Sequence, residues 1–243
     1  MIKNKDLEKF FGIEDKGSEY ERDKARKKTL LARCEFEKCG IYGIPMVHKQ
    51  IIDSEKIDLI CYTKAKTENS DIGKTVHFFT YDWKFEEVYA KPDIALEKID
   101  RYYALLTPEF SMYYDMPLAL KIYSVFKNRW CGAFWQNQGM KVIPTITWSE
   151  DSYDVCFEGV EKGCAVAVTT YTRGLEKDRF MPGYNLMLEK IEPSLIVCYG
   201  DPFDEMKGNV LAFDPYNKKE LIKKIGLAEY IRKYENDELY PVF

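Results

Sequence analysis

The strongest constraint on the fold is a set of apolar, β-branched segments in the second half of the chain, each followed by a helical pattern. They cover residues 142–148, 165–172 and 195–199. Because unbroken apolar runs between amphipathic helices are typical of strands buried on both faces, they predict a parallel sheet covered by helices. In such sheets ligands bind at the carboxyl ends of the strands. The pattern therefore predicts where a site lies, although no catalytic signature accompanies it.

From residue 41 onward the sequence predicts strands at 41–47, 57–62, 76–81, 102–107, 142–148, 165–172, 195–199 and 210–213. Eight strands in a chain of this length fit a TIM-like (β/α) barrel. The intervals after residues 47 and 62 are too short for the helix of a usual parallel crossover, so the first third is expected to pair antiparallel. We therefore predict an α/β fold, a mostly parallel sheet with flanking helices, with an irregular or partial TIM-like barrel as one arrangement.

Helical periodicity places the connecting helices. The longest begins at Pro117 and ends before Gly139, and Gly163 is expected to stop a helix that starts near Ser149. Pro144 lacks an amide donor, so we expect it at a strand start or a bulge. The predicted helices cover residues 117–139, 149–161, 184–191 and 218–225, followed by a charged helix after Gly226.

Composition predicts one main domain with two appendages. With 46% hydrophobic residues among 243, the chain can bury a large core. We expect a charged helical extension at 1–40, an α/β core at 41–215 and a helical extension at 216–243. A net charge of −4 gives no overall attraction to nucleic acid or to an anionic membrane. The start of the chain has no signal-peptide pattern and no segment has the length of a membrane span, so we expect a cytoplasmic protein.

A local basic run lies in the amino-terminal extension and is the candidate contact for a nucleic-acid partner. The alternative is a solvated helix with charge pairs to Glu19, Glu21 and Asp23. The seven cysteines fit a reducing compartment, and Cys61, Cys131, Cys156, Cys164 and Cys198 lie in apolar patterns typical of core packing. The basic run comprises Arg22, Lys24, Arg26, Lys27, Lys28 and Arg33.

Polar and aromatic residues follow the predicted strands and form the candidate site. Carboxylates, an arginine and rings at one edge could bind an anionic or ring-bearing ligand, or hold a divalent ion through oxygens. Helix capping explains some of them equally well, since Ser149 and Asp151 are natural N-caps. The candidates are the catalytic carboxylates Glu109, Asp151 and Asp201 and the substrate-binding residues Arg173, Trp148, Tyr171, Tyr199, Asp82 and Ser111.

Glu109 and Arg173 are the leading candidates. Glu109 follows a predicted strand and Pro108, a position that suits a general base or a metal ligand. Arg173 precedes Gly174, where a guanidinium could hold a phosphate or carboxylate. A salt bridge between Glu109 and Arg173 is the structural alternative.

Cofactor and nucleophile motifs are weak. Cys34, Cys39 and His48 resemble part of a zinc site without a fourth ligand, and a buried thiol pair is the alternative. His77 alternates with Phe79 along one strand face, which is typical of a core histidine. Gly73-Lys74-Thr75 is no phosphate loop, because a strand follows instead of a helix. A divalent metal stays an open prediction, and no nucleotide-cofactor motif is found.

Several short motifs are distinctive: the run from Tyr102 to Ser111 (YYALLTPEFS), NRW at 128–130, VIPT at 142–145, TRG at 172–174 and CYG at 198–200. Together with Met116-Pro117, Trp135-Gln136 and Gly139, they resemble the uncharacterised domain-of-unknown-function family 4417 of bacteria, phages and mobile elements. The resemblance covers about residues 40 to 215. It implies a phage or mobile-element context and motif residues at strand ends, and it brings no established activity.

Two classes of function follow. The first is a metal-assisted hydrolase or transferase acting on a phosphate-bearing nucleotide or nucleic acid, with Glu109, Asp151 and Asp201 as carboxylates and Arg173 as the anion clamp. The alternative is a noncatalytic accessory protein that binds DNA or a host protein through the basic run and exposed aromatic residues. The aromatic candidates are Trp83, Trp148 and Tyr171.

Overall fold

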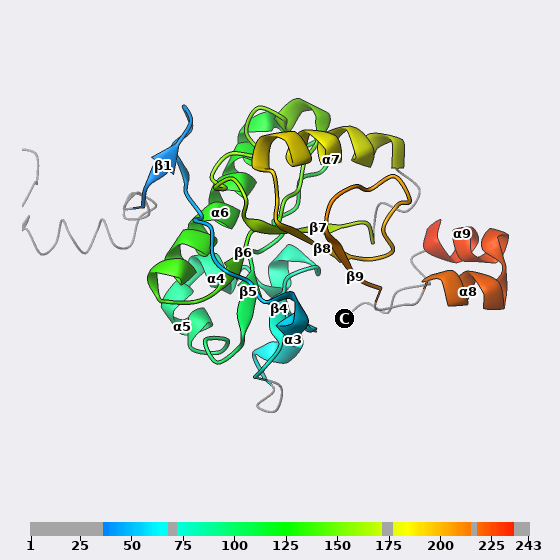
Figure 1. Cartoon of the computed structure of the whole chain (residues 1–243), viewed down its shortest axis with the longest axis horizontal. Helices are drawn as coiled ribbons and strands as arrows, with labels where there is room; N and C mark the ends of the chain where they lie inside the picture. Colours follow the sequence, from blue (N-terminus) through cyan, green and yellow to red (C-terminus); the bar gives the residue numbers. More distant parts are fainter. Residues whose placement is uncertain (1–35, 68–71, 172–176, 215–217, 236–243) are drawn as a thin grey trace, which may run out of the picture. The chain divides into compact units, whose positions relative to one another are not determined.

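The computed structural model describes residues 36–67, 72–171, 177–214 and 218–235 (Figure 1). Packing divides the chain into two compact units, Met1–Glu37 and Lys38–Phe243, and every element described below lies in the second unit. The predicted basic run and Arg173 lie outside the described residues. None of the helices in the described ranges is both long and apolar enough to cross a membrane.

The second unit alternates strands and helices (Figure 1). The strands are β1 (Lys38–Cys39), β2 (Ile44–Pro45), β3 (Leu59–Cys61), β4 (Thr75–His77), β5 (Ala104–Leu106), β6 (Val142–Ile143), β7 (Ala165–Thr169), β8 (Leu195–Tyr199) and β9 (Val210–Phe213). The α-helices are α3 (Tyr62–Ala65), α4 (Glu87–Ala90), α5 (Pro92–Leu96), α6 (Leu118–Asn137), α7 (Lys177–Ile191), α8 (Lys218–Ile225) and α9 (Leu227–Glu235). Short 3₁₀ turns are η2 (Ser54–Lys56), η3 (Asp82–Lys84) and η4 (Glu150–Ser152).

Seven strands run parallel and follow the order of the chain. Hydrogen bonds join them as β3-β4-β5-β6 and as β7-β8-β9, and an isolated parallel bridge between Thr145 and Ala167 links β6 to β7. The predicted α/β class with a mostly parallel sheet is confirmed. Among the described residues no pairing joins β9 to β3, so closure into a TIM-like barrel stays a prediction.

The sheet curls around one inner apolar face. Side chains from β3, β5, β6, β7, β8 and β9 belong to one hydrophobic cluster. Tyr199 of β8 contacts the rings of Phe79 and His77, which come from β4 and the residues after it. Strands that lie four places apart in the sheet can exchange ring contacts only if the sheet bends round, and this curvature brings the carboxyl ends of the strands to one rim. The cluster comprises Ile52, Ile57, Leu59, Phe79, Leu106, Ile143, Ala165, Ala167, Leu195, Val197, Leu211 and Phe213.

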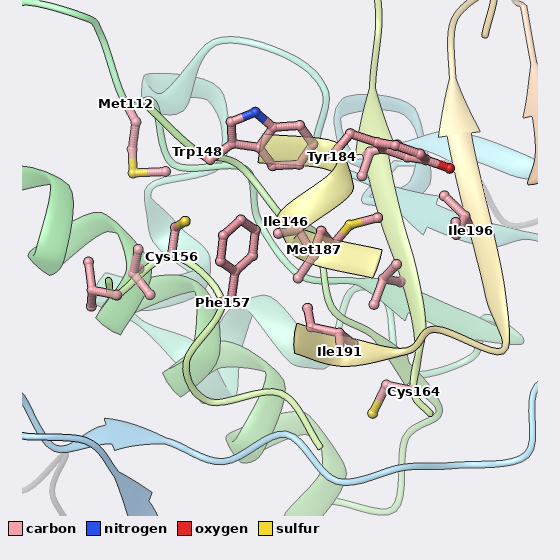
Figure 2. Close-up of a cluster of buried hydrophobic side chains, with 14 of the residues drawn as sticks. Met112, Ile146, Trp148, Cys156, Phe157, Cys164, Tyr184, Met187, Ile191 and Ile196 are labelled. Atoms are coloured by element: carbon pink, nitrogen blue, oxygen red, sulfur yellow. The ribbon is translucent and has the colours of Figure 1, made fainter. Parts of the chain in front are cut away.

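Helices cover the outer face. Tyr184, Met187 and Ile191 of α7 pack against Ile196 of β8 in a second apolar cluster, shown in Figure 2. A helical period of 3.6 residues places these three side chains on one face of α7. Removing a fully buried side chain of this size typically costs about 2–5 kcal/mol, so this face fixes α7 beside the strand ends.

Most predicted strands are confirmed, with two corrections in the first third. The expected strand at 41–47 is a short hairpin of β1 and β2, because Gly40 and Gly43 adopt φ of +63° and +62° and turn the chain. Within the described ranges antiparallel pairing is limited to this hairpin, and the prediction for the following strands is wrong, since β3, β4 and β5 are parallel. The four-residue α3 is enough for the crossover because about a dozen residues suffice to return the chain.

The helix predictions hold for α6, which follows Pro117, and for α8 and α9, which Gly226 separates. The helix expected at 149–161 is wrong. Only η4 forms there, because Ser149 and Ser152 satisfy each other's backbone groups and Gly159 adopts φ +73°. Pro144 follows the last residue of β6 instead of starting the strand, and its carbonyl accepts the amide of Ala167.

Candidate functional site

The candidate site lies at the rim formed by the carboxyl ends of β4 to β8. His77 and Phe79 come from the end of β4, and Glu109 follows β5. Thr147 follows β6, and Tyr199 ends β8. Parallel strands present their outgoing loops at a common edge, which is where ligands bind in open α/β sheets. The prediction that polar and aromatic tips gather at this edge can therefore be examined residue by residue.

A stack of rings fills the inner side of this rim. Tyr199 lies 4.7 Å from both Phe79 and His77, measured between ring centroids, and its ring is nearly parallel to that of Phe79. Tyr171 follows β7, and its ring centroid lies 5.7 Å from that of Tyr199. Tyr199 and His77 are buried, whereas Tyr171 is half-buried. The Tyr171 ring is therefore partly open to solvent.

His77 is a neutral histidine within this stack. Burial lowers its pKa to about 3, and its Nδ1 lies 3.3 Å from the backbone nitrogen of Phe79, whose N–H it accepts. Because Nδ1 accepts a hydrogen bond, the single ring proton resides on Nε2. The prediction of a core histidine, which was made from the alternation of His77 with Phe79, is confirmed.

Glu109 follows β5 at the same rim, directly after Pro108. Its side chain is half-buried, and Oε1 accepts a hydrogen bond from the Thr147 hydroxyl at 3.2 Å. Thr147 follows β6, so this bond ties together the outgoing ends of two neighbouring strands. The carboxylate is thereby held in place at the rim, as a general base or an ion ligand requires.

Buried polar groups of α6 hold the ends of β5 and β6. Asn128 donates to the carbonyls of Pro108 and Thr145 and accepts the Thr107 hydroxyl at 2.8 Å. The Thr107 hydroxyl in turn accepts the amide of Thr145 at 2.7 Å. Since buried backbone groups without partners are costly, this network fixes the loop that carries Glu109.

Arg129 extends this network. Its buried guanidinium donates to the carbonyls of Thr145, Cys156 and Glu158 at 2.8 to 3.0 Å and also to Asn128. Burial lowers its pKa to about 10. In the sequence, NRW was a distinctive motif without an assigned contact. In the structure its first two residues, Asn128 and Arg129, bind backbone carbonyls of the segments that follow β5 and β6 and so position the strand ends.

Asp82 and Ser111 are brought together at the outer side of the rim. The Asp82 carboxylate accepts the amide of Ser111 at 3.0 Å and its hydroxyl at 2.8 Å. Asp82 belongs to η3 after β4, and Ser111 follows β5. These hydrogen bonds therefore join the loops after β4 and β5. The Asp82 carboxylate already accepts hydrogen bonds from protein donors.

Asp151 and Trp148 lie elsewhere. The Asp151 carboxylate accepts hydrogen bonds from the buried ammonium of Lys121 at 2.8 Å and from the Ser149 hydroxyl at 2.7 Å. These hydrogen bonds lower the pKa of Asp151. Trp148 is buried in the outer cluster, where its ring would contact any side chain added at Gly183 (Figure 2). Both residues are held by contacts of the fold.

Asp201 follows β8 at the same rim as Tyr171. The Thr170 hydroxyl donates to the Asp201 carbonyl at 2.8 Å, which ties the two loops together. Between them, Gly200 adopts φ +114°, and a Cβ there would lie 2.6 Å from the Thr170 hydroxyl. Only glycine fits this approach, so Gly200 fixes how the chain leaves β8.

Metal-binding groups are sparse. Within residues 36–67, 72–171, 177–214 and 218–235, no three His, Cys, Asp or Glu side chains gather into a group that could hold an ion. His48 is exposed and pairs with Glu161 at 3.3 Å, while Cys34 lies outside the described residues. Four of the core cysteines, Cys131, Cys156, Cys164 and Cys198, are buried, and Cys61 is half-buried.

Comparison with known proteins places the chain in a family. Residues 36–217 match the family described as Domain of unknown function (DUF4417), and the chain belongs to it. The Gene 1 protein of Mycobacterium phage L5 is 35% identical over 176 residues, which are 71% of this chain and 77% of the phage protein. The Gene 1 protein of Mycobacterium phage D29 is 37% identical over 132 residues, 53% of this chain and 49% of that protein, so the chain spans about half of its length. No solved structure matches.

Proposed function

We propose that this phage-type member of the DUF4417 family is a hydrolase or transferase that binds a nucleotide or nucleic-acid substrate over the carboxyl ends of β4 to β8. The observation that carries the proposal is the ring stack of Tyr171, Tyr199, Phe79 and His77 at the same rim as the Glu109 carboxylate. A ring-bearing, charged substrate needs this combination of an aromatic surface and an ionisable group.

The stack supplies the site for a base. Tyr171 is its half-buried member, and aromatic rings prefer stacked or edge-to-face neighbours at about 4.5–7 Å between centroids. A nucleobase that packs against Tyr171 would extend a stack already built from four rings. Because Tyr199 is buried and fixed by Phe79, the surface is preorganised before a ligand arrives.

Glu109 supplies the acid-base group. The Thr147 hydroxyl orients one carboxylate oxygen and the Asn128 network fixes the loop, so Glu109 could accept a proton from a water or hydroxyl nucleophile. Asp201 follows β8 and is bonded through its carbonyl to Thr170, the residue before Tyr171; it is the second carboxylate of the proposal. Arg173 keeps its predicted role as anion clamp, although it lies outside the described residues.

A divalent ion would enter this site with the substrate. Mg²⁺ is usually bound by one or two carboxylates together with substrate phosphates and waters, and Glu109 and Asp201 are sufficient for that arrangement. Asp82 and Asp151 are already bonded to Ser111 and Lys121, so the proposal assigns them no contact with the ion.

The alternative is a noncatalytic protein that binds DNA or a host protein. One described observation favours it, since the Trp83 side chain is 71% exposed on the loop after β4. The basic run that this alternative also uses lies outside the described residues. Turnover separates the two functions, because only the enzyme consumes its ligand.

The test is a panel of ribonucleoside and deoxyribonucleoside mono- and triphosphates, each with and without Mg²⁺. We expect at least one to raise the melting temperature by several degrees, since a ligand at a hundred times its Kd stabilises by about 2.7 kcal/mol. The same ligand should be converted to a product detectable by chromatography. Glu109→Gln should abolish conversion and keep the fold.

The matched control is Glu97→Gln, which changes an exposed carboxylate between α5 and β5, at the opposite ends of the strands. It should leave conversion unchanged. The proposal is wrong if no nucleotide shifts the melting temperature, or if Glu109→Gln turns over its ligand as fast as the natural protein.

A further inference from the structure

Four exposed rings extend outward from the candidate site. Trp83 and Tyr81 lie on the loop after β4, with 71% and 51% of their side chains exposed, and Tyr113 and Tyr114 lie on the loop after β5, with 63% and 72% exposed. Scattered apolar residues are normal on a surface, whereas rings gathered on neighbouring loops indicate a binding surface. We call Tyr81, Trp83, Tyr113 and Tyr114 the rim platform.

The two loops of the rim platform are held together. The Asp82–Ser111 hydrogen bonds join them, and each bonded residue is within three positions of two platform rings. The Lys121 ammonium donates to the Tyr114 carbonyl at 3.0 Å and fixes the second loop to α6. The rings are therefore presented on a braced surface, which lowers the entropy lost when they bind a ligand.

Cations accompany the rings. The Lys84 ammonium lies 5.3 Å from the Trp83 ring and 5.5 Å from the Tyr81 ring, and the Arg179 guanidinium of α7 lies 5.2 Å from the Tyr114 ring. Each cation covers part of its ring, and the large exposed fractions show that the remaining ring surface is open to solvent. The arrangement alternates flat rings with positive charge, which matches the bases and phosphates of a nucleic-acid strand.

Among the described residues, the Lys84 ammonium contacts two rings but has no hydrogen-bond acceptor. Its Nζ is buried, and no described residue forms a hydrogen bond with it. Removing a charge from water without a partner is costly, so an anion that reaches Nζ would relieve this cost. A phosphate group of a strand stacked on Trp83 would be such an anion.

We propose that the rim platform binds single-stranded DNA and leads it to Glu109, so that the substrate of the proposed enzyme is a DNA strand. This inference rests on the proposed function. Bases would stack on Trp83 and Tyr114, and phosphates would pair with Lys84 and Arg179. Leu118 and Leu120, 42% and 51% exposed on the first turn of α6, supply an apolar surface that suits the thymine methyl group. RNA lacks that methyl group, which is why we commit to DNA.

The test is fluorescence anisotropy of a labelled twenty-nucleotide oligo(dT) with the full chain. Trp83→Ala and Tyr114→Ala should each weaken binding about tenfold, as loss of one stacking ring does. Trp83→Phe should recover most of that loss. Tyr42→Ala is the matched control, because Tyr42 is 44% exposed on the β1–β2 turn, outside the platform, and it should bind as the natural protein does.

The salt dependence of oligo(dT) binding gives a second readout. With Lys84 and Arg179 as the phosphate contacts, the logarithm of the binding constant should fall with a slope of about −1.4 against the logarithm of salt concentration. Asp115→Asn, which removes an exposed carboxylate next to Tyr114, should tighten binding. A steep slope of about −4, lost when Arg26, Lys27 and Lys28 become alanine, would locate binding in the basic run and overturn the platform.

The remaining outcomes also decide the inference. Oligo(dT) should bind more tightly than oligo(rU) or a duplex of the same length, and equal or weaker binding of oligo(dT) overturns the commitment to single-stranded DNA. Unchanged binding in Trp83→Ala and Tyr114→Ala overturns the platform.

Glu109→Gln should still bind oligo(dT). If nucleotides are converted but oligo(dT) does not bind, only this inference fails, and if oligo(dT) binds without any conversion, only the proposed enzyme fails.

Discussion

The two parts of the parallel sheet are stabilised in different ways. In β7 to β9 the strands are four or five residues long, and five residue pairs join β7 to β8. In β3 to β6 the strands have two or three residues, and only two pairs join β5 to β6. The first part, β3 to β6, relies on side chains of α6, whereas the second part, β7 to β9, relies on backbone hydrogen bonds. The side-chain network lies behind Glu109, so the part with the weaker ladder carries the candidate catalytic group.

Removing the Arg129 guanidinium should have the largest effect. Arg129→Ala leaves the carbonyls of Thr145, Cys156 and Glu158 without their donor, and we expect the free energy of unfolding to fall by about 3–5 kcal/mol. Urea unfolding at pH 7 measures this loss. Arg129→Lys should recover part of it if the alanine variant does not fold.

Thr169→Val is the matched change in the other part of the sheet. It removes the hydrogen bond that the Thr169 hydroxyl donates to the Tyr199 carbonyl and the one that it accepts from the Tyr171 amide, which should together cost about 2 kcal/mol. If Arg129→Ala costs no more than Thr169→Val, the two parts are stabilised alike and the comparison fails.

His77 joins the two parts, because it lies in β4 and contacts Tyr199 of β8. Its pKa is about 3 in the folded chain and near 6.5 when unfolded, so below about pH 6.5 the unfolded chain binds a proton that the folded chain does not. Its contribution to stability is therefore complete above pH 6.5 and is lost progressively towards pH 3, by about 2 kcal/mol at pH 5.

The measurement is urea unfolding at pH 7 and pH 5 for the natural protein and for His77→Phe. The variant should lose less stability between the two pH values. His48→Gln is the control, because it removes the exposed histidine, and it should alter the pH dependence less than His77→Phe does. Equal pH dependence in His77→Phe and in the natural protein would show that His77 is not buried as described.

The smallest expected effect is that of Asp151→Asn. The change weakens the bond to the buried Lys121 ammonium, so we expect a loss of about 1–2 kcal/mol at pH 7. Because the folded pKa of Asp151 is lowered, this contribution is present above the unfolded pKa of about 4 and is lost as the pH falls further. Urea unfolding measures it. Asp154→Asn alters a nearby exposed carboxylate and should be neutral, and a comparable loss in that control would contradict the assignment.

The sequence predicted the second part of the sheet better than the first. Apolar runs defined β8 and β9 to the residue, and β8 is buried on both faces, which leaves an unbroken pattern. Strand direction in the first third could not be read from loop length, since the four-residue α3 is enough for a parallel crossover. Short strands also leave little pattern of their own, and their position depends on α6 side chains that are distant in sequence.

The sequence predicted which residues follow the strand ends, but it predicted their contacts less well. Strand ends indicated Glu109, Tyr171 and Tyr199, which lie at one rim. Asp151 and Trp148 follow strand ends equally well in sequence, yet a buried lysine and an apolar cluster engage them. Such contacts depend on residues brought together by folding, and one sequence does not reveal them.

The central claim is that a nucleotide-class ligand binds over the carboxyl ends of the strands. Amide hydrogen exchange on the full chain, with and without saturating Mg²⁺ and thymidine triphosphate, tests it most directly. We expect slower exchange in residues 77–85, 107–114, 145–149 and 199–201, and unchanged exchange at the amino ends of β3 to β8. Protection confined to the amino ends of the strands, or no change at the four carboxyl-end segments, would contradict the claim.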